Sequence, residues 1–142
     1  MMKLPSLIAV LALSAPLLAS AAAAAPPPLP PGTPAFASLK GDPAAGKAAF
    51  NACRVCHVAI SNENRIGPTL HGVVGRASGS VKGYNYSAAN KAIRVVWTEP
   101  ALYAYLLAPQ AYMPGTRMTY GGLKDAQKRA DVIAYLKTKP AS

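Results

Sequence analysis

Acidic residues and cysteines are both scarce in this chain of 142 residues. Five Asp and Glu stand against fifteen Lys and Arg, which gives a formal net charge of +10. Such a charge favours nucleic acid, an acidic membrane surface or an acidic protein as a partner. The basic residues are scattered along the chain and form neither a continuous block nor a basic stripe on a helix. This spacing argues against nucleic acid.

The chain has only two cysteines, Cys53 and Cys56, which excludes a scaffold of several disulfides. A bridge across so short a gap would be strained and would stabilise almost nothing. A zinc site needs about four ligands, and the rest of the domain adds only His71 and a few carboxylates to the residues around the cysteines. A thiol–disulfide redox site should follow a strand in a βαβ unit, and the sequence has no strand pattern. The cysteines therefore need another role.

The first 25 residues have the composition of a secretory signal peptide. A short start containing Lys3 precedes an apolar run at residues 7–18, and an alanine-rich tract at 19–25 offers small-residue cleavage sites. The alternative is an uncleaved membrane anchor, because residues 4–25 could almost span a bilayer. Export also argues against nucleic acid as a partner.

Residues 26–38 are predicted to be a proline-rich linker. Six prolines fall within residues 26–34, and such a stretch favours an extended, semi-rigid conformation. It would be either a disordered N-terminal segment of the mature protein or, with a retained anchor, a spacer above a membrane. One folded domain is therefore expected over residues 39–142.

Capping residues and apolar spacing predict an all-α domain with short helices and two long loops. The expected helices begin after Asp42, Ser87, Thr98 and about Asp125, and the last one buries Ala126, Ala130, Ile133 and either Val132 or Leu136. Residues 61–86 and 109–122 are expected to be irregular. The apolar helical faces are too few to cover one another. A large apolar cofactor would fill the gap.

Residues 53–57 read Cys-Arg-Val-Cys-His, the C-x-x-C-H motif of covalent c-type haem attachment. Cysteines three apart at a helix end project to the same side, so Cys53 and Cys56 can add to two vinyl groups on one haem edge. His57 follows on the next turn and can place a ring nitrogen on the iron. The motif predicts one covalently bound haem c.

A haem iron needs a sixth ligand if its open position is not to bind small molecules. A methionine opposite a histidine suits an electron carrier, because it raises the reduction potential. The domain contains two candidates, Met113 and Met118, both in a Pro-Gly loop at residues 112–118. A methionine is also a common core residue. The residues alone leave the choice open.

The domain resembles the class I c-type cytochromes, in particular mitochondrial cytochrome c and its bacterial periplasmic counterparts. The resemblance rests on residues 41–47, 53–57, 67–72, 75–76, 83–91, 97, 112–118 and 129–137, in the family's order. It implies the class I cytochrome c fold, in which short helices and long loops wrap around one haem.

The resemblance also implies roles for individual residues. Met118 matches the axial methionine, and Met113 falls at a core position. The carbonyl of Pro68 would accept a hydrogen bond from His57, and the hydroxyl of Tyr105 would lie near the Met118 sulfur. The implied iron ligands are thus His57 and Met118, and the implied haem contacts are Cys53, Cys56, Pro68, Arg76, Tyr86, Asn90, Trp97, Tyr105 and Thr116, with Tyr86 and Trp97 donating to a buried propionate.

The implied function is single-electron transfer between redox proteins, such as a membrane oxidoreductase complex, an oxidase or a dehydrogenase, by a periplasmic monomer that is not an enzyme. The alternatives are a membrane-tethered carrier and a haem enzyme or gas sensor, which would need an open sixth position. Arg54, Arg65, Arg117 and Lys124 would lie near the exposed haem edge. Ala52, Gln110 and Ala111 stand where mitochondrial members carry docking lysines, and Tyr120 replaces a phenylalanine, so the partner is not identified.

Overall fold

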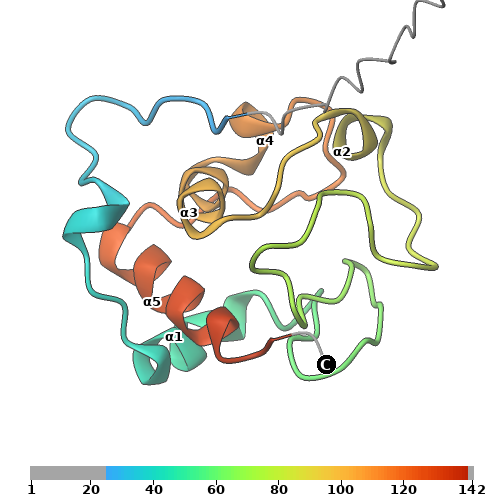
Figure 1. Ribbon diagram of the computed structural model, residues 1–142, viewed down its shortest axis with the longest axis horizontal. Coiled ribbons are helices and arrows are strands. Elements are labelled where there is room, and N and C mark those ends of the chain that lie inside the picture. Colours follow the sequence, from blue (N-terminus) through green and yellow to red (C-terminus); the bar gives the residue numbers. More distant parts are fainter. Residues whose placement is uncertain (1–24, 141–142) are drawn as a thin grey trace, which may run out of the picture.

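Short helices joined by long loops make up the computed structural model, which describes residues 25–140 (Figure 1). The predicted all-α fold is confirmed, since within this range the only β pairing is an isolated bridge between Ala77 and Val96. The predicted signal peptide lies almost entirely outside the described residues. The elements are η1 (Phe36–Ser38), α1 (Pro43–Ala49), η2 (Phe50–Ala52), α2 (Ala88–Ala92), α3 (Glu99–Leu107), α4 (Pro109–Tyr112) and α5 (Ala126–Lys137).

Each predicted helix start is confirmed by a side-chain cap. Asp42, Ser87, Thr98 and Asp125 accept hydrogen bonds from backbone amides in the first turns of α1, α2, α3 and α5, respectively. These bonds satisfy amides that have no partner within the helix. Helix α2 is shorter than its predicted end near Arg94, because Arg94 adopts a left-handed conformation with φ of 50°.

Helix α4 corrects the prediction that residues 109–122 are entirely irregular. Pro109 ends α3 but also starts α4, because proline is well suited to the first position of a helix. The amides of Tyr112 and Met113 bond to the carbonyls of Ala108 and Pro109 at 3.0 and 2.9 Å. This single turn directs Tyr112 and Met113 into the core.

Helices α1 and α5 cross at Gly46. A Cβ at this position would overlap the carbonyl group of Asp131, so only glycine permits the approach. Nearby, the rings of Phe50 and Tyr135 pack with centroids 5.3 Å apart. On α5 both Val132 and Leu136 are buried, while Ala126 is only half-buried.

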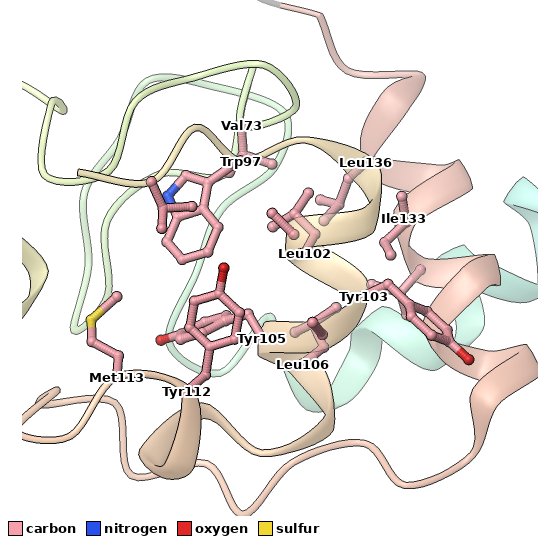
Figure 2. Close-up of a cluster of buried hydrophobic side chains, with 14 of the residues drawn as sticks. Val73, Trp97, Leu102, Tyr103, Tyr105, Leu106, Tyr112, Met113, Ile133 and Leu136 are labelled. Atoms are coloured by element: carbon pink, nitrogen blue, oxygen red, sulfur yellow. The ribbon is translucent and has the colours of Figure 1, made fainter. Parts of the chain in front are cut away.

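Helix α3 passes through the middle of the core. All residues from Ala101 to Leu106 are buried, so the helix must be covered on every side. Figure 2 shows Trp97, Tyr105 and Tyr112 gathered on one side of α3, with Tyr103 and Ile133 on the other.

The N-terminal segment contacts the body of the protein. Leu29, Phe36 and Leu39 pack against the core, and the Pro34 carbonyl accepts a hydrogen bond from Tyr103 at 2.9 Å. We call residues 29–41 the strap; it runs along the outer edge of the molecule toward α1 (Figure 1). Within the expected linker at 26–38, residues 31–32 form a turn and residues 36–38 form η1, and its apolar side chains Leu29 and Phe36 pack against the folded core. Within residues 25–140 no helix has the length and apolar content needed to cross a bilayer.

The crossing at Gly46 can be tested by replacing this residue with valine. Gly46→Val should lower the free energy of unfolding by about 3 kcal/mol, at the upper end of overpacking effects, because the obstacle is backbone. Ala48→Val, on the exposed side of the same helix, should cost only about 0.5 kcal/mol through helix propensity. Denaturant unfolding would measure both, and equal losses would contradict the assigned crossing.

Candidate functional site

A cavity of about 710 Å³ lies between α3 and the long loops. It is lined by all eleven predicted site residues, namely Cys53, Cys56, His57, Pro68, Arg76, Tyr86, Asn90, Trp97, Tyr105, Thr116 and Met118. Neither Met113 nor His71 lines it. A second hollow of about 490 Å³, between the strap and α5, contains no cysteine, histidine or methionine. The chemistry-bearing side chains therefore converge on one cavity.

The two thiols and the imidazole reach the cavity through one tight turn. Helix α1 continues through η2, and the amides of Cys56 and His57 then bond to the Cys53 carbonyl at 3.1 and 3.0 Å. Both cysteines are half-buried and are not bonded to each other. Burial, and secondarily the neighbouring Cys56, raises the pKa of the Cys53 thiol to about 11. A thiol that stays protonated at neutral pH is unsuited to disulfide exchange.

His57 is oriented by the backbone. Its Nδ1 lies 2.7 Å from the Pro68 carbonyl oxygen, and burial lowers the pKa of the ring, with the Pro68 hydrogen bond opposing this effect. A neutral ring that donates from Nδ1 keeps the lone pair of Nε2 free for a metal. Gly67 makes room for the ring, since a Cβ there would collide with it.

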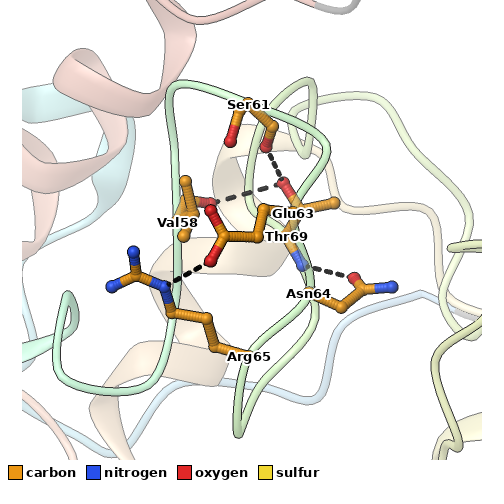
Figure 3. Close-up of polar contacts among 6 residues, drawn as sticks. All are labelled: Val58, Ser61, Glu63, Asn64, Arg65 and Thr69. Atoms are coloured by element: carbon orange, nitrogen blue, oxygen red, sulfur yellow. Dashed lines mark hydrogen bonds and ion pairs between the residues drawn. The ribbon is translucent and has the colours of Figure 1, made fainter.

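The loop that presents Pro68 is held by contacts that the sequence analysis missed (Figure 3). The Thr69 hydroxyl donates to the Ser61 carbonyl at 2.6 Å, and the Thr69 amide donates to the side chain of Asn64 at 3.0 Å. Asn64 also donates to the Lys82 carbonyl at 3.1 Å, which joins this loop to the next one. No repeating pattern marks these residues, because their partners lie 5, 8 and 18 positions away within irregular loops.

The two methionines have different surroundings. Met113 is 1% exposed and belongs to the core. Met118 is half-buried at the cavity, where its sulfur accepts a hydrogen bond from the Tyr105 hydroxyl at 3.2 Å. Its amide donates to the Thr116 hydroxyl at 3.3 Å, and its carbonyl accepts from the side chain of Gln110. Burial raises the pKa of Tyr105, against a hydrogen bond with Thr116 that lowers it.

Polar groups gather at another part of the cavity wall. Arg76 donates to the carbonyls of His71 and Thr69 at 2.8 and 2.7 Å. Burial raises the pKa of Tyr86, opposed by a backbone hydrogen bond from Val81 and by the charge of Arg76. The side-chain oxygen of Asn90 is buried without a hydrogen-bond partner. An amide oxygen only accepts hydrogen bonds, so a carboxylate bound at this wall would pair with donors such as Arg76 rather than with this oxygen.

A sequence model of the family described as cytochrome c matches residues 43–139. The chain belongs to the cytochrome c family. It is 51% identical over 102 residues to cytochrome c 2.1 of Caenorhabditis elegans, a match that covers 71% of this chain and 92% of the relative. It is 52% identical over 99 residues to cytochrome c2 of Rhodopila globiformis, a match that covers 69% of this chain and 93% of the relative. The solved structure of cytochrome cH from Methylobacterium extorquens superposes with a TM-score of 0.67 at 44% identity, covering 70% of this chain and all of that one.

The cavity fits the cofactor of this family. Cys53 and Cys56 line a large cavity beside a histidine whose Nε2 is free, which is the donor set that C-x-x-C-H attachment needs. Within residues 25–140 no three His, Cys, Asp or Glu side chains cluster as a zinc site would require. The protein is a carrier of single electrons, with haem c attached through the two cysteines. The haem supplies an iron that alternates between two oxidation states.

Proposed function

We propose that His57 and Met118 would be the two protein ligands of the haem iron, which would supply the one-electron chemistry of the carrier. Support comes mainly from the Tyr105–Met118 hydrogen bond of 3.2 Å, because it places one of the two methionine sulfurs at the cavity wall. The 2.7 Å contact between His57 and Pro68 supports the other ligand. Fixed ligands limit the rearrangement that accompanies electron transfer, which suits a carrier better than an enzyme or a gas sensor.

The polar wall would hold one buried haem propionate. Tyr86 and Trp97 would donate hydrogen bonds, Asn90 and Thr116 would lie close by, and Arg76 would contribute its positive charge. Two N–H groups of Arg76 are already bonded to carbonyls, so its remaining N–H groups stay available. A buried carboxylate is stable only with such donors or a cation.

The ligation is tested by replacing each methionine in turn. Met118→Ala should abolish the sulfur-to-iron charge-transfer band of the oxidised protein and allow the reduced protein to bind carbon monoxide. Met113→Leu, which conserves core volume, should leave the band in place. Carbon monoxide binding by the unaltered protein would instead favour the haem enzyme or sensor.

The partner is expected to be an acidic redox protein that docks at the haem edge. Val55 and Ile66 line the cavity and are 71% and 76% exposed, so they mark an apolar rim where docking can occur. Arg54, Arg65, Arg117 and Lys124 are exposed as well. Charge around a small apolar contact raises the association rate without requiring slow release. The carrier would act as a monomer.

Electrostatic steering predicts a strong dependence on salt. The second-order rate of electron transfer to the native partner should fall roughly tenfold as ionic strength rises from about 10 to about 150 mM, where the screening length shrinks from roughly 30 to 8 Å. Arg54→Glu should lower the low-salt rate more than Lys40→Glu, since Lys40 lies by the second hollow. Rates indifferent to salt, or equal losses in both variants, would indicate docking by apolar contact alone.

We also propose that the leader, residues 1–25, is removed during export, so that the carrier works in the periplasm. Mass spectrometry of a periplasmic fraction should find a mature chain that begins between residues 20 and 26, because the small-residue tract follows the apolar run. Full-length protein found only in membranes would favour the tethered alternative.

A further inference from the structure

Helix α3 separates the cavity from the strap. Leu102, Tyr105 and Leu106 line the cavity. Tyr103 is turned by about 200° from Tyr105 around the helix axis and projects to the opposite side (Figure 2). A displacement of α3 away from the cavity would therefore be opposed by whatever covers Tyr103.

The strap provides this cover. The Tyr103 hydroxyl donates to the Pro34 carbonyl at 2.9 Å, and its ring packs against Phe36 with centroids 5.4 Å apart. The guanidinium of Arg129, on α5, lies 4.2 Å from the Tyr103 ring centroid. Tyr103 and Arg129 are both 0% exposed. Tyr103 is thus held between the strap and α5.

The strap is itself fixed where it meets α5. The Lys40 carbonyl accepts a hydrogen bond from the side chain of Gln127 at 2.8 Å. Just beyond the strap, the Asp42 amide donates to the Asp131 carboxylate at 2.9 Å. The family match begins only at residue 43, so the strap is a part of this chain that lies outside the region matched to the family.

We propose that the strap positions α3 so that Tyr105 holds the Met118 sulfur, with Phe36 and Tyr103 as its positioning residues. This inference rests on Met118 being an iron ligand. Without the strap, α3 can move into the space behind Tyr103. The Tyr105–Met118 hydrogen bond then weakens, and Met118 leaves the iron more often. In this way the strap, from the far side of α3, keeps the sixth coordination position of the iron closed to added ligands.

The affinity for added imidazole measures how often Met118 dissociates from the iron. Imidazole can bind the iron only when the methionine is displaced, so its apparent affinity follows the population of the open form. Phe36→Ala in the oxidised holoprotein should raise imidazole affinity about tenfold, the effect of roughly one lost side-chain contact. Tyr103→Phe, which removes only the bond to Pro34, should raise it by about threefold. Phe36→Leu, which keeps a large apolar side chain, should show an imidazole affinity close to that of the unaltered protein.

Tyr135→Ala is a matched control. The Phe50–Tyr135 pair has centroids 5.3 Å apart and an interplanar angle of 50°, against 5.4 Å and 49° for Phe36–Tyr103. Tyr135 does not line the cavity. Its loss should destabilise the fold in denaturant without changing imidazole affinity or the charge-transfer band.

The results separate the two proposals. Equal imidazole affinities in Phe36→Ala, Tyr135→Ala and the unaltered protein, with the band intact throughout, would overturn the role of the strap alone. A band absent from the unaltered protein would overturn the ligation by Met118, and with it the inference that depends on it.

Discussion

The hydrogen bond between His57 and the Pro68 carbonyl is the contact on which the site depends. It fixes which ring nitrogen carries the proton and so leaves Nε2 available to the iron. The bond forms only because neighbouring residues permit it. Gly67 leaves space for the ring, and Thr69 and Asn64 hold the loop that carries Pro68. The same loop is joined to the following one through Lys82. A network of loop contacts, rather than a helix, therefore positions the histidine.

A cofactor of this size also explains why the domain has so little regular structure. Helix α3 is buried on all sides, yet the α-helices that make its main contacts are α5 and the short α4. The remaining cover comes from loops around the cavity and from the strap. The α-helices are only 4 to 12 residues long, so their apolar faces cover little of one another. An attached haem would fill the cavity of about 710 Å³ and so complete this core.

The sequence predicted the features that depend on near neighbours. Caps such as Asp42 and Thr98 act within one turn, so the helix starts were found, and the C-x-x-C-H motif located the cavity. Contacts between distant residues were found where the family resemblance implied them, as for His57 with Pro68 and Tyr105 with Met118, but other distant contacts were missed. No local pattern marked Arg129, which is fully buried against Tyr103. The prolines at residues 26–34 excluded helix and strand there, but the short helix η1 forms just after them, and their spacing could not show that Phe36 packs on the same ring.

The two proposed ligands are supported in different ways, and this difference has a consequence. His57 bonds to backbone in a loop that is joined to its neighbours, whereas Met118 is held through the side chain of Tyr105, on a helix whose far side rests on the strap. A backbone carbonyl within a bonded loop can move little. A side chain on a short helix follows every displacement of that helix. Under the proposed ligation, the methionine side of the iron would therefore be the side at which changes elsewhere in the protein act, because the strap contacts α3, the helix that carries Tyr105.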